Sequence, residues 1–243
     1  MNASSAPGPR PDLVIFDFDG CLVDSEAMAL EILAELLAEL GAPEDVGALR
    51  RFLGVSLHVV LEHVARATGR PCPPDFAAEW HRRLFAAYER ELRVMAGAAE
   101  FLDRLDALGL PCCIASGAAT PRLEAALRLS GLAGRFAGRA YSADLVAHGK
   151  PAPDLFLLAA ARQGTRPERC VVVEDATSGV KGAVAAGMRV LGFVGGSHLE
   201  GVREAHALRL REAGAAAVYA DYERLAHDLL GDEVAGGPAG AGS

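Results

Sequence analysis

Short runs of apolar and β-branched residues alternate along the chain with stretches in which apolar residues recur at helical spacing. We predict six strands from these runs, at residues 13–16, 111–115, 139–141, 170–173, 189–193 and 217–219. Such an alternation is typical of a parallel sheet covered by helices. The hydrophobic pattern therefore predicts an α/β fold with a Rossmann-like parallel sheet as its core.

One long stretch, from about residue 25 to residue 93, contains helical patterns only. Its first helix is expected to begin after Asp24 and Ser25, which are good N-cap residues, and to end at Gly41. We therefore predict a helical cap inserted after the first strand at residues 25–93, an α/β core of residues 11–24 and 94–231, and flexible tails at residues 1–10 and 232–243.

The composition is that of a globular protein, because 51% of the 243 residues are hydrophobic and 23% are charged. With 32 acidic against 24 basic residues the net charge is -8, which argues against a nucleic-acid or anionic-membrane surface. No apolar stretch approaches the ~18 residues of a membrane-spanning helix, so we expect a cytoplasmic protein. The five cysteines form no C-x-x-C pair and are interpreted as free packing thiols. The oligomeric state does not follow from the sequence, although a monomer is favoured.

Two acids follow the first predicted strand directly, in Asp17-Phe-Asp19-Gly20. Side chains two apart on a strand point the same way, so Asp17 and Asp19 can converge at the carboxyl end of the sheet, where ligands bind in such folds. Gly20 allows the next backbone to turn tightly and to present N–H groups to an anion. A D-x-D-G motif alone has many false matches, and its partners must make it specific.

A hydroxyl follows the second predicted strand, in Ser116-Gly117. The Ser116 hydroxyl and the Gly117 N–H lie at a strand-to-helix turn, which suits a phosphate oxygen. Thr120 before Pro121 is expected to cap the next helix. No G-x-S-x-G is present, so we do not expect Ser116 to be a nucleophile.

Two further groups of polar residues stand at predicted strand or helix ends. Lys150 lies in a proline-held loop, His148-Gly-Lys-Pro-Ala-Pro153, and supplies a positive charge; His148 is left out of the predicted site. Glu174 and Asp175 follow a strand of buried type. Adjacent carboxylates at a strand end are costly without a cation, and oxygen-only ligands favour Mg²⁺.

Together and in this order, Asp17-Phe-Asp-Gly-Cys-Leu-Val-Asp-Ser-Glu26, Ser116, Gly-Lys150-Pro and Glu174-Asp175 resemble the four motifs of the haloacid dehalogenase superfamily, over roughly residues 12 to 220. The Leu-Val-Asp-Ser-Glu run and the helical insert resemble the subgroup of sugar-phosphate phosphatases and beta-phosphoglucomutase-like proteins. In that subgroup the insert is a mobile cap over the active site.

The resemblance implies a role for each motif residue. Asp17 would attack phosphorus and form an aspartyl-phosphate, and Asp19 would act as acid and then as base. Mg²⁺ would be held by the Asp17 carboxylate, the Asp19 carbonyl and Asp175, with Glu174 as a direct or water-linked ligand. The groups that neutralise the phosphoryl group would be Ser116, the Gly117 N–H and Lys150.

We therefore expect a magnesium-dependent phosphatase of small phosphorylated metabolites, either sugar or sugar-acid phosphates. One alternative is a hexose-phosphate mutase of the beta-phosphoglucomutase type. Ala29 and Leu57 stand where those mutases carry a histidine and an arginine, which speaks against that activity. Another alternative is a non-catalytic protein that binds phosphorylated metabolites. The leaving group would be read by polar residues of the cap, with these candidates: His58, His63, His81, Arg82 and Arg83.

Overall fold

The computed structural model describes residues 10–231, so both predicted tails, Arg10 apart, lie outside the described residues. Six strands form one sheet in the order β3-β2-β1-β4-β5-β6, and every neighbouring pair is parallel. Their bounds are β1 (Leu13–Phe16), β2 (Cys112–Ser116), β3 (Ala140–Ser142), β4 (Cys170–Glu174), β5 (Arg189–Phe193) and β6 (Ala217–Tyr219). All six predicted strands are confirmed to within one residue at each end.

The sheet is covered on both faces, which explains why β1, β2 and β4 are buried along their whole length. Crossovers between parallel strands are right-handed, and the strand order reverses direction after β3. One face is thus covered by α5 (Ala98–Ala107) and α6 (Thr120–Leu129), and α10 (Tyr222–Leu230) lies on the same face because it packs against α5. The other face carries α7 (Asp154–Arg162), α8 (Thr177–Ala185) and α9 (Arg203–Glu212).

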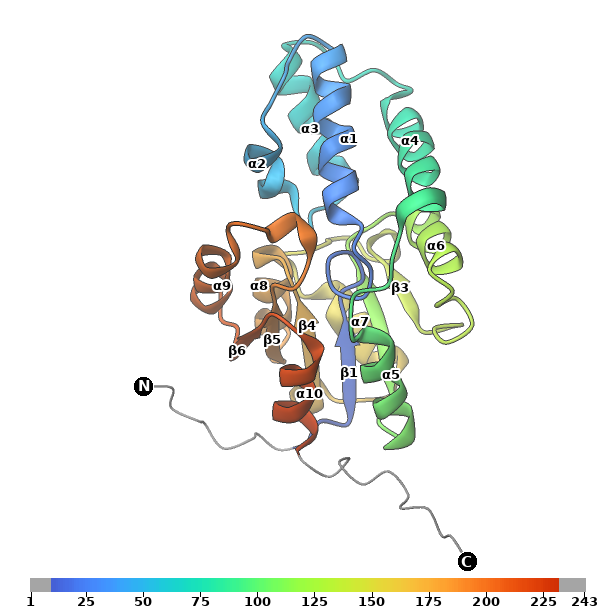
Figure 1. The fold of residues 1–243 in the computed structure, drawn as a ribbon, viewed down its shortest axis with the longest axis vertical. Helices are drawn as coiled ribbons and strands as arrows, with labels where there is room; N and C mark the ends of the chain where they lie inside the picture. The colour runs from blue at the N-terminus through green and yellow to red at the C-terminus, as the bar shows by residue number, and fades with distance from the viewer. Residues whose placement is uncertain (1–9, 232–243) are drawn as a thin grey trace, which may run out of the picture.

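The segment between β1 and α5 is helical, as predicted, and we call residues 25–93 the helical insert. It contains α1 (Glu26–Glu39), α2 (Val46–Leu49), the 3-10 turn η1 (Arg50–Phe52), α3 (Leu57–Thr68) and α4 (Phe76–Glu91). Figure 1 shows these helices as one group beyond the carboxyl ends of the strands. The two crossings lie side by side, because Val23 and Val94 form an antiparallel bridge and the Asp24 N–H donates to the Arg93 carbonyl at 3.0 Å. The division into core and cap domains stays a prediction.

Of two predicted helix caps, that of α1 is confirmed in position but not in its hydrogen bond, and that of α6 is wrong. Ser25 precedes α1, but its hydroxyl does not cap the helix; it donates instead to the Asp19 carboxylate, 2.5 Å away. Thr120 is the first residue of α6, and Ala119 holds the cap position without a capping side chain. The free Thr120 N–H donates to the carboxylate of Asp144 at 2.7 Å. In both places a tertiary contact replaces the local one that the sequence suggested.

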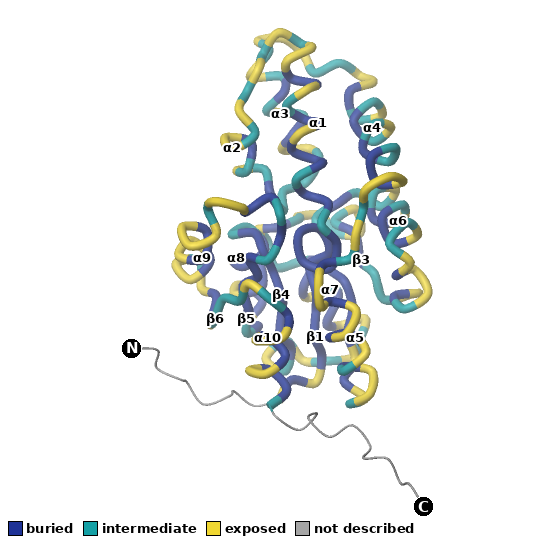
Figure 2. Tube along the Cα trace, in the orientation of Figure 1, coloured by how far each residue is buried: buried dark blue, intermediate teal, exposed yellow. Residues whose placement is uncertain are grey.

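The remaining short elements are the 3-10 turns η2 (Ala143–Leu145), η3 (Pro167–Arg169) and η4 (Ser197–Leu199). Within residues 10–231, no helix is both long and apolar enough to cross a membrane. Figure 2 shows that buried residues occur both in the sheet and in the part of the helical insert next to it. The carboxyl edge of the sheet is thereby enclosed, and this is where the predicted site residues lie.

Candidate active site

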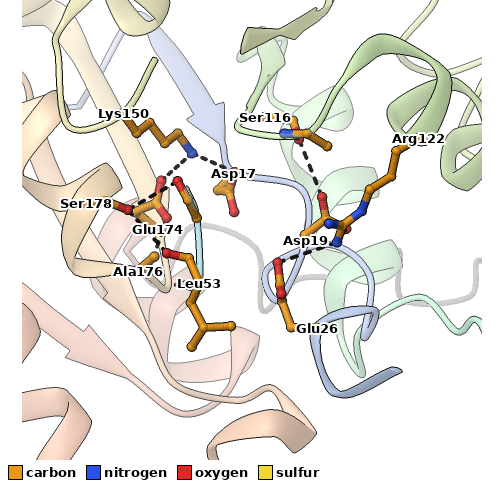
Figure 3. A network of polar contacts seen from close by, with 12 residues as sticks. Asp17, Asp19, Glu26, Leu53, Ser116, Arg122, Lys150, Glu174, Ala176 and Ser178 are labelled. Atoms are coloured by element: carbon orange, nitrogen blue, oxygen red, sulfur yellow. Dashed lines mark hydrogen bonds and ion pairs between the residues drawn. The ribbon is translucent and has the colours of Figure 1, made fainter. Parts of the chain in front are cut away.

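The four sequence motifs meet at the carboxyl edge of the sheet. Asp17 directly follows β1, which lies between β2, ending at Ser116, and β4, ending at Glu174. The Asp17 N–H donates to the Val173 carbonyl at 2.9 Å, which fixes the backbone of Asp17 beside β4. Lys150 reaches the same point from the loop before α7 (Figure 3). Parallel strands therefore bring together residues that are up to 158 positions apart in sequence, from Asp17 to Asp175.

Lys150 connects two of the acids. Its Nζ donates to Asp17 Oδ1 at 2.6 Å and to Glu174 Oε2 at 2.7 Å, and all three side chains are at most 4% exposed. Burial alone would lower the pKa of Lys150, but the two facing carboxylates raise it above its usual range. Lys150 is thus a permanently charged ammonium group at the centre of the site.

One ammonium does not balance the acids around it. Burial and the charge of Glu174 raise the pKa of Asp17 well above its ordinary value, even though Lys150 opposes the shift. Burial likewise raises the pKa of Glu174 to about 7 against the effect of Lys150. Both shifts have the same cause, because three buried carboxylates, including that of Asp175, share one lysine. The carboxylates therefore outnumber the positive charges at the site, and a second cation would compensate the excess negative charge.

The residues present fit a magnesium ion. Ligand atoms of Asp17, Cys21 and Asp175 all lie within 4.8 Å of one another, and Asp175 Oδ2 is buried and has no hydrogen-bond partner within residues 10–231. Carboxylate oxygens are the ligands that Mg²⁺ prefers. Burial and the charge of Asp175 raise the pKa of the Cys21 thiol well above its usual range, so Cys21 is a poor ligand. Both oxygens of Glu174 already accept hydrogen bonds, from Lys150 and from the Ala176 N–H.

His198 is a site residue that the sequence analysis missed. Its Nε2 lies 3.0 Å from Asp175 Oδ2, an ion-pair distance, and neither atom has a hydrogen bond among the described residues. Burial lowers the pKa of His198, and the Asp175 carboxylate more than reverses this, so that the net shift is upward. A signal was present: Gly195-Gly-Ser-His198 follows β5, so it too lies at the carboxyl edge of the sheet.

Asp19 lies in a second polar group, next to the first. Its Oδ1 accepts from Ser25 Oγ at 2.5 Å and from Arg122 Nη2 at 2.9 Å, whereas its Oδ2 has Ser116 Oγ at 3.5 Å. Arg122 Nη2 also lies 3.6 Å from the carboxylate of Glu26. Burial raises the pKa of Glu26 to about 8 in spite of this arginine. Figure 3 shows Arg122 between Asp19 and Glu26, with its guanidinium group directed at both carboxylates.

The helical insert reaches the motif residues at Gly54. Ser178 Oγ donates to the Gly54 carbonyl at 3.2 Å, and a Cβ on Gly117 would lie 3.1 Å from that same oxygen. A glycine at position 117 thus allows a loop of the helical insert to approach the turn after β2. The approach encloses a pocket whose lining is mainly apolar, with these polar or charged members: Asp17, Asp19, Glu26, His81 and Arg122.

Only one of the five predicted leaving-group residues lines this pocket, namely His81. Three of the others form ion pairs away from it, because His58 pairs with Glu62, Arg82 with Glu79, and Arg83 with Glu79 and Glu39. His63 contacts the Glu44 carboxylate inside the helical insert. Burial lowers the pKa of His81, which favours the neutral imidazole.

Known proteins share this arrangement. Residues 11–187 match the family described as haloacid dehalogenase-like hydrolase. Fructose-1-phosphate phosphatase YqaB of Escherichia coli is 31% identical over 72% of this chain and 92% of that protein. Another relative, SUPPRESSOR OF QUENCHING 1 of Arabidopsis thaliana, is 34% identical over 73% of this chain, but the match spans only 17% of that longer protein.

Solved structures agree in fold. A haloacid dehalogenase-like protein of Agrobacterium tumefaciens has 40% sequence identity and a TM-score of 0.73, and the match covers 88% of this chain and 95% of the other. A family hydrolase of Deinococcus radiodurans, with bound phosphate and sodium, has 35% identity and a TM-score of 0.71, covering 93% and 96%. With the match over residues 11–187, these likenesses show that the chain belongs to the haloacid dehalogenase-like hydrolases.

Proposed function

We propose that this protein is a magnesium-dependent phosphatase of small phosphorylated metabolites. The observation that carries the proposal is the arrangement around Asp17, which faces the buried Lys150 ammonium. In the same cluster, Asp175 Oδ2 has no hydrogen-bond partner in the described part of the chain. A carboxylate approaches a phosphate dianion only where cations screen their repulsion. Such a setting suits a nucleophilic carboxylate.

The chemistry divides into two steps. Asp17 attacks phosphorus and the bond to the leaving oxygen breaks, while Asp19 gives that oxygen a proton. Water then attacks the phosphorus of the aspartyl-phosphate, Asp19 takes up its proton, and the bond to Asp17 breaks to release phosphate. Lys150, Ser116 Oγ and the Gly117 N–H hold the phosphoryl oxygens throughout.

The cation would be held by Asp17, Asp175 and the Asp19 carbonyl, and when bound it would supply positive charge to the phosphoryl oxygens. Glu174 would act through Lys150 or a water, because both of its oxygens already have donors. His198 would keep the Asp175 carboxylate in place by its charge.

For the substrate we propose sugar or sugar-acid phosphates, in keeping with the named activity of the Escherichia coli relative. The pocket supports hydrolysis over the mutase alternative. Ala29 and Leu57, which replace the histidine and arginine of the mutases, both line it, so neither position offers a polar group to a sugar phosphate.

The test is phosphate release from a panel of sugar and sugar-acid phosphates, with Mg²⁺ and with EDTA. Wild-type protein should release phosphate only with the metal, and Asp17→Asn should release none while its melting temperature shows an intact fold. An active Asp17→Asn protein would falsify the nucleophile assignment. Isomerisation of glucose 1-phosphate without release would favour the mutase. No activity in either assay would leave a substrate outside the panel or the binding protein.

A further inference from the structure

Arg122 belongs to none of the four motifs, yet its guanidinium group contacts three parts of the chain. It lies on α6 and donates from Nη2 to Asp19 and from Nε to the Tyr88 hydroxyl on α4, at 2.9 and 3.2 Å. Glu26, at the start of α1, lies 3.6 Å away. Its side chain is only 12% exposed. Arg122, on a helix that covers the sheet, thus contacts both Asp19, the proposed acid–base residue, and the helices α1 and α4 of the helical insert.

The two carboxylate oxygens of Asp19 have different hydrogen-bond partners. Oδ1 is held by two short hydrogen bonds, from Arg122 and from Ser25. Oδ2 has one long contact, with Ser116 Oγ at 3.5 Å, on the side where the phosphoryl group would bind. Oδ2 is therefore the oxygen left for proton transfer, and the direction in which it points is set by what holds Oδ1.

The hold on Oδ1 also depends on the helical insert. Tyr88 is 2% exposed and lies on α4, which packs against α6. Its hydroxyl accepts from the Nε of Arg122, and a guanidinium group is planar, so fixing Nε limits the direction in which Nη2 points. If α4 moved away from α6, Arg122 would lose the partner that orients it toward Asp19.

We propose that Arg122 is a positioning residue that aims Asp19 Oδ2 at the leaving oxygen, and that it does so only while Tyr88 of α4 lies against it. This inference rests on the proposed phosphatase function. It links the place of the helical insert to the proton donor of the first step. It predicts that Arg122 matters most for esters whose leaving oxygen needs that proton.

The test compares kcat/KM for two esters, because kcat/KM reports the steps up to departure of the leaving group. A sugar phosphate has an alkoxide leaving group that needs a proton, whereas p-nitrophenyl phosphate releases a stable phenolate without one. For Arg122→Gln we expect a loss of about 100-fold with the sugar phosphate, the low end of general acid catalysis, and less than about 5-fold with the aryl ester. Arg128→Gln, on an exposed part of the same helix, should change neither.

Two further variants separate positioning from general damage. In an Asp19→Asn background, Arg122→Gln should cause no further loss with the sugar phosphate, because it acts through Asp19. Tyr88→Phe removes only the hydroxyl and should reproduce the same preference for the aryl ester with a smaller loss. Equal losses on both esters, or an added loss in the Asp19→Asn background, would overturn the positioning role.

The contact with α4 has a readout that needs no activity. If Arg122 and Tyr88 act together, the double variant should lose less melting temperature than the two single losses added, and additive losses would overturn the link to α4. Failure of the proposed function looks different, because the wild-type protein would then hydrolyse neither ester.

Discussion

Replacement of Lys150 by methionine tests the electrostatics at the centre of the site. The substitution keeps the aliphatic part of the side chain and removes the ammonium group that lies 2.6 Å from Asp17 and 2.7 Å from Glu174. Breaking a buried ion pair by removing one partner costs about 3–5 kcal/mol, because a buried charge is left uncompensated. In a chain of this size, we expect the melting temperature to fall by about 6–20 °C.

The loss should depend on pH, with a sign that follows from the acids. The pKa values of Asp17 and Glu174 are raised in the folded protein from ordinary values of 3.8 and 4.5. Groups of this kind favour the folded state most below their ordinary pKa, and that contribution is lost as pH rises toward the folded pKa. Removing Lys150 raises both folded values further. The gap between variant and wild type should therefore widen above about pH 7, where Glu174 ionises in the folded wild type but not in the folded variant, by up to about 1.4 kcal/mol per pH unit.

The measurement is urea unfolding at about pH 8.5 and about pH 6, on either side of the folded pKa of Glu174, in EDTA so that no metal masks the loss. Lys181→Met is the matched control, because Lys181 is the chain's other lysine and lies exposed on α8. We expect Lys150→Met to be far less stable than the control at the higher pH and closer to it at the lower one. The reasoning would be refuted if Lys150→Met and Lys181→Met were equally stable at the higher pH, or if the difference between their unfolding free energies did not change with pH.

Two other predictions concern the same site. A Cβ on Gly179 would lie 1.9 Å from Glu174 Oε2, so Gly179→Ala should displace Glu174 from Lys150, cost about 1–3 kcal/mol in urea unfolding and reduce phosphate release. Gly134→Ala, where nothing lies within 4 Å, should do neither, and equal behaviour of the two variants would contradict this. Mg²⁺ at tenfold its Kd should add about 1.4 kcal/mol to the unfolding free energy of the wild-type protein, and Asp175→Asn should abolish most of this gain. If the wild-type melting temperature did not change with Mg²⁺, the metal site would be contradicted.

The sheet could be predicted from the sequence because its strands are short, β-branched and buried on both faces. Such runs stand out from amphipathic helices whatever their neighbours, so all six were placed to within one residue. The convergence of the motifs could be predicted from the parallel arrangement of the strands. Strand ends in one parallel sheet share an edge, so residues at the ends of β1, β2 and β4 must come close wherever they stand in the sequence.

The residues that the sequence did not reveal act through contacts that no local pattern records. Ser25 looks like a helix cap, and only the fold shows its hydroxyl turned to Asp19. Arg122 looks like any arginine near a helix start, and its role depends on α4 packing against α6. His198 is the exception, because its place after β5 could have been used.

This difference has a physical reason that bears on substrate choice. Of the proposed phosphoryl-binding residues, Ser116 and Gly117 lie at the end of β2, where backbone pairing fixes their position, and Lys150 lies in a proline-held loop, so motifs suffice to identify them. The pocket that we propose for the leaving group is lined largely by the helical insert, whose helices are held in place by side-chain packing against α6 and against one another. Which side chains such a pocket presents to a substrate depends on which helix faces pack together. Ala29, Leu57 and His81, for example, line it from three different helices, α1, α3 and α4. Reaction type is thus readable from strand-end motifs, whereas the substrate must be sought by varying the residues of the helical insert.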